Sequence, residues 1–302
     1  MSKVALVFPG QGSQVPGMGQ ALAEANPAAM AVWDEVSSAL GRDIKVLAWN
    51  SDEDTLRQTQ NAQIALFTCG VAAARALDVV PDAVAGHSVG EYAALVVAGV
   101  LSLSEGARLI EHRGRLMSQA KGGGMAAVLG AEREAVEATC AKAPGTLVVA
   151  NDNSPGQLVV SGDSESVEWV VGQASEMGAK RVLPLKVSGA FHSPLMADAA
   201  REMGTHLREA TFSAGTVPVY ANVTASRTEN GDWADLLQRQ LESPVRWTES
   251  VLAMREDGIE MFVECGAGEV LTGLLKRIDK TAIGFAAGTP EQLETIRHEI
   301  SR

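Results

Sequence analysis

The pentapeptide GHSVG at residues 86–90 constrains the fold of this chain more than any other feature of its sequence. It stands between a short apolar run at 83–87, which predicts a buried strand, and a longer apolar stretch that predicts a helix. A serine with glycines two positions away on each side can occupy a sharp strand-to-helix turn, the nucleophile elbow, because glycines avoid side-chain clashes there. We therefore predict that Ser88 is a nucleophile. A chance GxSxG in a glycine-rich chain is the alternative, which the strand-turn-helix context disfavours.

The rest of the chain also indicates an α/β protein. Residues 3–8 form a continuous apolar run stopped by Pro9-Gly10, which is typical of a strand buried on both faces of a parallel sheet. After a glycine triplet the predicted order becomes strand-helix-strand-strand-helix-strand, the split βαβ arrangement. We predict an α/β-hydrolase-like large domain with a parallel sheet at 1–122 and 189–302, and an inserted ferredoxin-like small domain at 123–188.

The individual elements follow from apolar residues that recur at the strand or the helix period. The expected strands lie at 3–8, 83–87, 125–130, 146–151, 157–162, 179–187, 216–223 and 260–265. The expected helices lie at 28–40, 61–77, 104–119 (opened by Ser104), 131–143, 164–178, 192–210, 233–242, 246–257 and 268–278.

A serine nucleophile needs a base, and the chain has five histidines. The elbow directs the side chain of His87 elsewhere, and His112 and His206 lie in amphipathic helices, where solvated positions are expected. His298 is near the C-terminus, where an α/β-hydrolase triad has its histidine, but its neighbours predict a polar helix rather than a loop. His192 follows a loop at the domain junction, which suits catalysis. His192 is therefore a candidate base, with the choice left open by these patterns alone.

A second unusual segment, PGQGSQ at 9–14, directly follows the first strand. It has part of a dinucleotide-binding fingerprint, but the third glycine is missing and no acidic ribose ligand follows at the right distance. It is either a tight turn or a loop of backbone N–H donors beside the nucleophile. Parallel strands permit the second interpretation because both loops then lie at the carboxyl ends of strands.

Net charge and cysteine content exclude several classes of function. The chain carries 25 Lys and Arg against 37 Asp and Glu, a formal net charge of −12, so its surface repels nucleic acid and anionic lipid. The longest apolar stretch, 92–103, is too short for a membrane span of about 20 residues. Cys69, Cys140 and Cys265 form no CxxC pair and no metal pattern, which predicts reduced, buried thiols. We expect a cytoplasmic protein with no metal, no nucleic acid and no membrane partner.

Six segments in order resemble a known family. They are FPGQGSQ (8–14), GHSVGEYAAL (86–95), HRGRLM (112–117), NSPGQLVVSG (153–162), GAFHSPLM (189–196) and SPVRW (243–247). Over nearly its whole length the chain is similar to the malonyl-CoA:acyl carrier protein transacylase family, the acyltransferases of bacterial fatty-acid synthesis and, as domains, of polyketide synthases. A free-standing chain of this length resembles the discrete fatty-acid-synthesis enzyme.

This resemblance implies a reaction and assigns its catalytic residues. The reaction is ping-pong transfer of a malonyl group from coenzyme A to the phosphopantetheine thiol of acyl carrier protein, through a malonyl-serine ester. Ser88 matches the nucleophile and His192 its base, while Gln11 and Val89 match the positions that donate backbone N–H groups to the oxyanion. Gln240 matches the residue whose backbone carbonyl orients the histidine. The family thus uses a Ser-His dyad without a carboxylate.

The resemblance also implies substrate contacts and the absence of a cofactor. Arg113 matches the residue that pairs with the malonyl carboxylate, for which a planar guanidinium in a water-poor site is well suited. Phe191 matches a bulky position that fills the space of an α-methyl group, so weak use of methylmalonyl-CoA is expected. Arg246 stands where other members can have Gln, and a surface role is the expectation for it. Malonyl-CoA is a substrate, and no cofactor is implied.

Two other functions remain as alternatives. A serine esterase or thioesterase of the α/β-hydrolase type shares GxSxG but needs a late histidine, for which His298 is the candidate. An interaction scaffold on a degenerate acyltransferase is disfavoured because every matched catalytic position is occupied. Acyl carrier proteins are acidic, so this acidic chain needs a local basic patch to bind one. The candidates for that patch are Lys180, Arg181, Lys186, Lys276 and Arg277. We expect a monomer.

Overall fold

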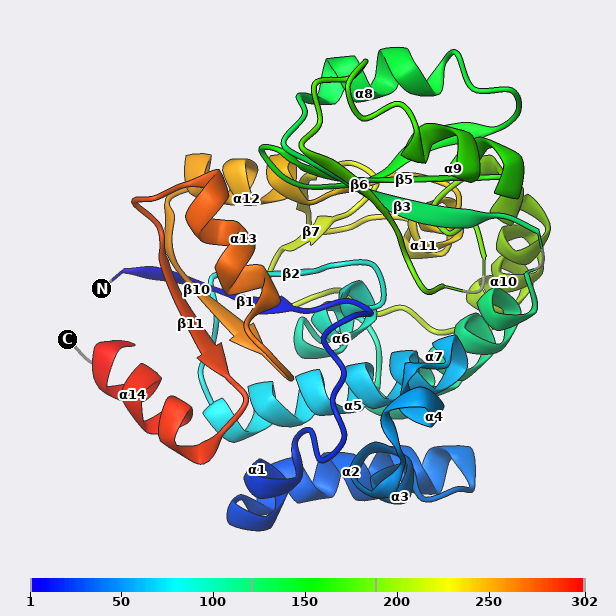
Figure 1. The fold of residues 1–302 in the computed structure, drawn as a ribbon. Coiled ribbons are helices and arrows are strands. Elements are labelled where there is room, and N and C mark those ends of the chain that lie inside the picture. Colours follow the sequence, from blue (N-terminus) through cyan, green and yellow to red (C-terminus); the bar gives the residue numbers. More distant parts are fainter. Residues whose placement is uncertain (1, 121, 188, 301–302) are drawn as a thin grey trace.

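The computed structural model describes residues 2–120, 122–187 and 189–300, which form an α/β protein with two β-sheets (Figure 1). The larger sheet has the strand order β11-β10-β1-β2-β7-β8, in which all neighbours are parallel except β7 and β8. Its strands are β1 (Lys3–Phe8), β2 (Ala83–Gly86), β7 (Val219–Ala221), β8 (Ser226–Thr228), β10 (Ile259–Cys265) and β11 (Ile283–Ala287).

Helices cover both faces of this sheet, and further helices pack on those helices. Together they are α1 (Gln20–Ala25), α2 (Pro27–Leu40), α3 (Ile44–Asn50), α4 (Glu53–Arg57), α5 (Thr59–Leu77), α6 (Gly90–Val97), α7 (Leu103–Gln119), α10 (Ala197–Glu209), α11 (Trp233–Gln240), α12 (Trp247–Glu256), α13 (Val270–Ile278) and α14 (Pro290–Ile300). A short 3-10 helix, η1 (Pro194–Met196), precedes α10. In Figure 1, α12 and α13 lie on one side of the sheet and α5 on the other.

The apolar run in β1 explains this three-layer arrangement. Val4, Leu6 and Phe8 pack into the core that contains α5, whereas Ala5 and Val7 pack with residues of α12 and α13. A strand alternates its side chains between two faces, so an unbroken apolar run needs cover on both. As predicted, β1 is a central strand of a parallel sheet.

The second sheet has the order β6-β3-β5-β4-β9 and is antiparallel except between β4 and β9. Its elements are β3 (Gly124–Leu129), α8 (Arg133–Cys140), β4 (Leu147–Ser154), β5 (Gln157–Gly162), α9 (Ser164–Val171), β6 (Arg181–Pro184) and β9 (Val245–Arg246). On one face, Ala126 and Val128 join a core shared with α8 and α9. On the opposite face, Met125 and Ala127 line a pocket, so this sheet forms one wall of a cavity between the two sheets.

Several element boundaries differ from the predicted ones for local reasons. The helix predicted to open at Ser104 begins at Leu103, and Ser102 is its N-cap, accepting a hydrogen bond from the backbone N–H of Glu105. The helix predicted over 164–178 ends at Val171, with Gly172 as its C-cap. The strand predicted over 179–187 spans only β6.

Larger differences concern short strands that were not predicted at all. No strand was predicted for β8, β9 or β11, and the helix predicted over 246–257 is instead α12 preceded by β9. Because β9 pairs with β4, a segment from outside the predicted small domain joins its sheet. Residue 188, the predicted end of that domain, lies outside the described residues.

The expectations about cysteines and membrane spans can also be compared with the structure. Cys69, Cys140 and Cys265 are buried free thiols, and desolvation raises the pKa of each, to about 12 for Cys69 and about 11 for Cys140. Across the described ranges, no helix combines the length and apolarity needed to cross a membrane. In that same part of the chain, no three His, Cys, Asp or Glu side chains are grouped as metal ligands.

Candidate active site

Ser88 lies in a sharp turn between β2 and α6, with a left-handed backbone conformation at φ 52°. The glycines of the motif are required by close packing. A Cβ on Gly86 would lie 1.9 Å from the carbonyl carbon of Gly90, and a Cβ on Gly90 would lie 2.2 Å from the carbonyl oxygen of Phe8. The turn therefore has the geometry expected of a nucleophile elbow at the carboxyl end of a parallel strand.

His192 faces Ser88 across the pocket and is almost fully buried. Its Nε2 lies 2.7 Å from Ser88 Oγ, while its Nδ1 lies 2.8 Å from the carbonyl oxygen of Gln240 and 3.2 Å from that of Ser243. Carbonyl oxygens only accept hydrogen bonds, so Nδ1 carries the proton and Nε2 is free to accept the serine proton. The arrangement is a dyad whose histidine is oriented by the backbone.

The electrostatics of the pocket keep His192 neutral. Burial, with a smaller contribution from the positive charge of Arg113, lowers the pKa of His192 to about 3. A neutral imidazole is the form that can act as a general base. Near neutral pH, His192 is therefore ready to accept a proton from Ser88.

Arg113 is fully buried and contacts the nucleophile directly. Its Nη2 donates to Ser88 Oγ at 3.0 Å and to the side-chain oxygen of Gln240 at 3.0 Å, and its Nη1 donates to Gln63 Oε1 at 2.7 Å. The Tyr92 ring lies 5.7 Å from the guanidinium carbon. Arg113 therefore lies on the buried face of α7, and its positive charge is at the centre of the site rather than in solvent.

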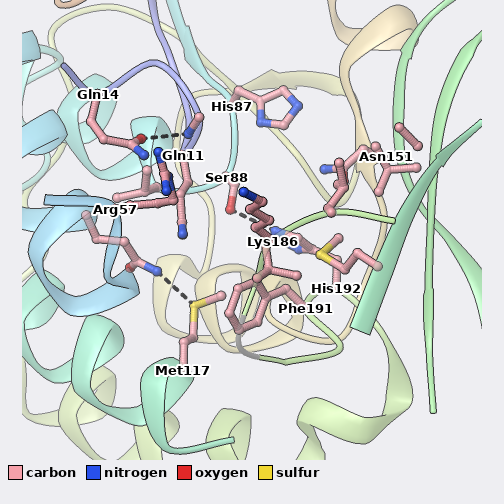
Figure 2. Close-up of a pocket in the computed structure, with 18 of the residues that line it drawn as sticks. Gln11, Gln14, Arg57, His87, Ser88, Met117, Asn151, Lys186, Phe191 and His192 are labelled. Atoms are coloured by element: carbon pink, nitrogen blue, oxygen red, sulfur yellow. Dashed lines mark hydrogen bonds between the residues drawn. The ribbon is translucent and has the colours of Figure 1, made fainter. Parts of the chain in front are cut away.

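The dyad opens into a cavity of about 450 Å³ between the two sheets (Figure 2). Figure 2 shows Ser88 and His192 at its centre, with Gln11 on one side, Asn151 on the other, and Phe191 and Met117 below them in this view. This volume lies within the range of small-molecule binding sites. Phe191, which is 5% exposed, forms part of the apolar wall beside the dyad.

Two backbone amides flank the nucleophile. Gln11 belongs to the loop after β1, and Val89 follows Ser88 in the elbow; both residues line the pocket. The register Phe8↔Gly86 brings the ends of β1 and β2 together, so both loops lie at one edge of the sheet. Neither amide N–H donates a backbone hydrogen bond within the described ranges.

Three contributors to the site were missed by the sequence reasoning. Asn222 accepts a hydrogen bond from the Ser88 N–H at 2.8 Å and donates to the carbonyl oxygen of Gly86 at 2.6 Å. Gln63 contacts Arg113, and Glu91 contacts both Asn222 and Gln240. Each had a signal: a polar residue after a strand, a glutamine in an apolar helix, and a glutamate inside the elbow motif itself.

The other histidines have different roles from the dyad. The elbow directs the side chain of His87 toward Asn153, whose Oδ1 lies 2.8 Å from its Nε2, and toward the Trp247 ring, although His87 is also among the residues that line the pocket. His112 and His206 are stacked, with ring centroids 3.8 Å apart. His298 is outside the pocket lining and lies 3.6 Å from the carboxylate of Glu299.

The predicted basic residues are divided between the pocket rim and the surface. Lys186 is exposed and lines the pocket, and Arg277 donates at 2.8 Å to Gln157, another lining residue. Lys180 and Arg181 lie at the start of β6 and are exposed. Arg246 is paired with Glu249 and donates to the carbonyl oxygen of Val223, outside the pocket lining.

A buried Ser-His dyad, with a guanidinium at the nucleophile, on a parallel α/β sheet defines a serine enzyme of acyl transfer. Comparison with known proteins gives the same class, because the acyl transferase domain model matches residues 5–285. The malonyl CoA-acyl carrier protein transacylase of Bacillus subtilis (strain 168) is 42% identical over 97% of this chain and 96% of its own length.

Solved structures agree with this result. A malonyl CoA-acyl carrier protein transacylase from Coxiella burnetii has a TM-score of 0.96 and 37% identity, covering 100% of this chain and 98% of its own. A malonyl-transacylase solved with its type II polyketide synthase acyl-carrier protein has a TM-score of 0.95 and 38% identity, covering 99% and 100%. This chain belongs to the malonyl-CoA:acyl carrier protein transacylase family.

Proposed function

We propose that the chain transfers a malonyl group from coenzyme A to the phosphopantetheine thiol of an acyl carrier protein. The observation that carries this proposal is the fully buried guanidinium of Arg113, 3.0 Å from the nucleophile oxygen. A malonyl group has a carboxylate close to its reacting carbonyl, and an acetyl group has none. Arg113 lines the pocket beside Ser88, and a planar guanidinium is suited to binding a carboxylate there.

In the first half-reaction His192 is the general base and Ser88 the nucleophile. Nε2 of His192 takes the hydroxyl proton while Oγ attacks the thioester carbon. The C–S bond then breaks, and the protonated histidine returns the proton to the departing coenzyme A thiolate. The product is a malonyl ester on Ser88.

In the second half-reaction the carrier thiol takes the place of coenzyme A. His192 accepts the thiol proton, the sulfur attacks the ester carbon, and the proton passes back to Ser88 Oγ as the ester C–O bond breaks. The free enzyme and malonyl-carrier result. Both steps pass through a tetrahedral oxyanion, for which the N–H groups of Gln11 and Val89 are the donors. Removal of one such donor typically costs about 2.7–4 kcal/mol.

The histidine needs no carboxylate partner in this mechanism. The carbonyl oxygen of Gln240, 2.8 Å from Nδ1, holds the imidazole in the required tautomer and also stabilises the proton carried there. No cofactor and no metal enter either half-reaction, which is acyl exchange between oxygen and sulfur.

We further infer the finer fold, domain division and surroundings of the enzyme. The sheet order β6-β3-β5-β4 supports a ferredoxin-like small domain at 123–188, and the parallel strands β11-β10-β1-β2-β7 support an α/β-hydrolase-like domain at 1–122 and 189–302. We propose that the enzyme is a cytoplasmic monomer. The carrier would dock on the basic patch of Lys180, Arg181, Lys186, Lys276 and Arg277, because carrier proteins are acidic.

Intact-mass analysis tests the proposed reaction. Incubation with malonyl-CoA should add one malonyl group to the protein, and Ser88→Ala should abolish the adduct. Addition of acyl carrier protein bearing phosphopantetheine should discharge it. A wild-type protein that stays unmodified, or hydrolyses malonyl-CoA without forming malonyl-carrier, would contradict the proposal and favour an esterase.

A further inference from the structure

One buried carboxylate beside the dyad takes no part in the mechanism above. Glu91 lies in the first turn of α6, three residues after Ser88, and is 2% exposed. Its Oε1 accepts a hydrogen bond from the backbone N–H of Asn222 at 3.3 Å, and its Oε2 accepts one from Nε2 of Gln240. The carboxylate thus joins two segments that meet at the active site from distant parts of the chain.

Both partners of Glu91 hold the dyad. Asn222 fixes the elbow through its bonds to the Ser88 N–H and the Gly86 carbonyl oxygen. Besides its bond to Glu91, Gln240 has three contacts with the site: its backbone oxygen orients His192, its Nε2 donates to the Ser88 carbonyl oxygen at 3.0 Å, and its Oε1 accepts from Arg113. Glu91 contacts the side-chain amide of Gln240, which also holds the guanidinium, whereas His192 is held by the Gln240 backbone.

Glu91 and the Ser88 carbonyl oxygen together determine which way the Gln240 amide faces, and Glu91 is the one side chain among these two acceptors. An amide nitrogen only donates and an amide oxygen only accepts. The carboxylate of Glu91 accepts from the nitrogen, so the oxygen must face Arg113. A reversed amide would direct its own N–H groups at the guanidinium donors, which would weaken the hold on Arg113.

We propose that Glu91 is a positioning residue that sets acyl-group selectivity, because its hold on the Gln240 amide keeps Arg113 in place at Ser88. This inference rests on the proposed function, since selectivity concerns the malonyl carboxylate that Arg113 binds. Glu91 contacts neither His192 nor the Ser88 hydroxyl, so it acts through Gln240 and Asn222.

The cost of burying this carboxyl supports a specific role. Desolvation raises the pKa of Glu91 to about 7. The hydrogen bonds from Gln240 and Asn222 and the charge of Arg113 lower this pKa, but by less than desolvation raises it. Burying a carboxylate is unfavourable unless its oxygens are satisfied. A second buried glutamate, Glu264, provides a comparison: it accepts from the backbone of Leu271 and Thr272 and caps α13, away from the pocket.

The test compares Glu91→Gln with the matched variant Glu264→Gln. A glutamine at 91 accepts from only one of the two donors, because its own NH2 group faces the other. We expect the ratio of kcat/KM for malonyl-CoA to that for acetyl-CoA to fall about tenfold to a hundredfold, the range of one hydrogen bond to a charged group. Glu264→Gln should lower Tm and leave the ratio within about twofold of wild type.

A fluorophosphonate probe separates positioning from general damage. The probe carries no carboxylate, so its reaction with Ser88 depends on the dyad but not on Arg113 as an acyl receptor. Glu91→Gln should slow malonylation far more than probe labelling, and Glu91→Asp, which keeps a carboxylate on a shorter side chain, should restore part of the selectivity. An unchanged malonyl-to-acetyl ratio, or equal loss of malonylation and labelling, would overturn the proposal.

Two controls keep the outcomes distinct. If wild-type protein reacts with the probe but not with malonyl-CoA, the proposed function fails while the dyad stands. If Glu91→Gln does not fold, Glu91→Asp decides the matter: a reduced selectivity ratio supports the positioning role, and a wild-type ratio overturns it.

Discussion

At the scale of single residues, the dyad depends on two backbone conformations that residues other than glycine rarely adopt. Ser88 and His192 have φ values of 52° and 56°, and they are two of four non-glycine residues with positive φ in the described ranges. Such conformations cost about 1–3 kcal/mol each and persist where the surroundings enforce them. Here Asn222 and the motif glycines enforce the first, and the contacts of the imidazole with two carbonyl oxygens hold the second residue.

Arg113→Ala should separate malonyl from acetyl transfer. Malonyl transfer should fall by about a hundredfold or more, because two charge-assisted hydrogen bonds of about 1.5–3 kcal/mol each are lost. Acetyl transfer should be retained or increased. The measurement is kcat/KM for the two coenzyme A esters, with Arg115→Ala, on the exposed face of the same helix, as the control. An equal loss of both activities would count against carboxylate recognition.

His192 makes stability depend on pH in a defined direction. Its pKa is about 3 when folded and 6.5 in its ordinary state, so below pH 6.5 the unfolded chain binds a proton that the folded chain does not. The stability that this residue contributes is therefore present above pH 6.5 and is lost on acidification, by about 2 kcal/mol between pH 7.5 and pH 5.

Urea unfolding at the two pH values measures this loss. His192→Asn should lose about 2 kcal/mol less free energy of unfolding than wild type on going from pH 7.5 to pH 5. Identical losses in the two proteins would show that His192 is protonated in the folded state at pH 5.

Phe191 should restrict the α-carbon of the acyl group. The ring is buried in the pocket wall beside His192, so an α-methyl group has to compete with it for space. Wild type should use methylmalonyl-CoA poorly, and Phe191→Ser should raise its kcat/KM relative to that of malonyl-CoA. Comparable specificity constants for the two esters in the wild-type enzyme would refute this role.

At the scale of elements, the junction of β2 and α6 is the tightest contact in the site. Gly86→Ala would place a Cβ 1.9 Å from the backbone of Gly90, so the elbow has to open. We expect a loss of about 1–3 kcal/mol or more in free energy of unfolding, together with loss of Ser88 acylation. Gly273→Ala in α13, where a Cβ meets no atom within 4 Å, should be neutral or stabilising in the same unfolding assay.

Sequence periodicity predicted the elements that have a strong pattern of their own. The apolar strand β1, the helix α5 and the elbow between β2 and α6 were predicted because local residues suffice to define them. The two-residue strand β9 and the short β8 have no such pattern, since they exist through pairing with β4 and β7. α9 ended early because a single glycine outweighed a continuing apolar pattern.

The same distinction applies to the site. Ser88 could be predicted from the residues themselves, His192 only as one open choice among the histidines, and Arg113 only by resemblance, because by itself it reads as a surface charge. Glu91 could not be predicted, because its contacts join it to Asn222 and Gln240, 131 and 149 residues away. Hydrophobic periodicity reports only local secondary structure, so it cannot reveal a hydrogen bond between residues so far apart in the sequence.

At the scale of the whole molecule, a chain of net charge −12 has to bind an acidic carrier. The double variant Lys180→Glu and Arg181→Glu should raise KM for the carrier and leave KM for malonyl-CoA unchanged, because both residues are exposed on β6 or next to it. Steady-state kinetics with each substrate varied gives the two constants.

Reversal of Arg75 is the control for this prediction. This exposed arginine lies in the last turn of α5, outside both the patch and the pocket lining. Arg75→Glu changes the net charge without altering the patch and should leave both constants at wild-type values. If the double variant also leaves both constants unchanged, Lys180 and Arg181 are not part of the carrier site.

The strand β9 connects the small sheet with the backbone that holds the general base. It is paired with β4, a strand of the small sheet. Gln240 and Ser243, whose carbonyl oxygens contact His192, lie only a few residues before β9. One short segment of backbone, residues 240–246, is thus anchored at one end to His192 and at the other to the small sheet. The position of the imidazole in the large domain is therefore tied covalently to the position of the small sheet.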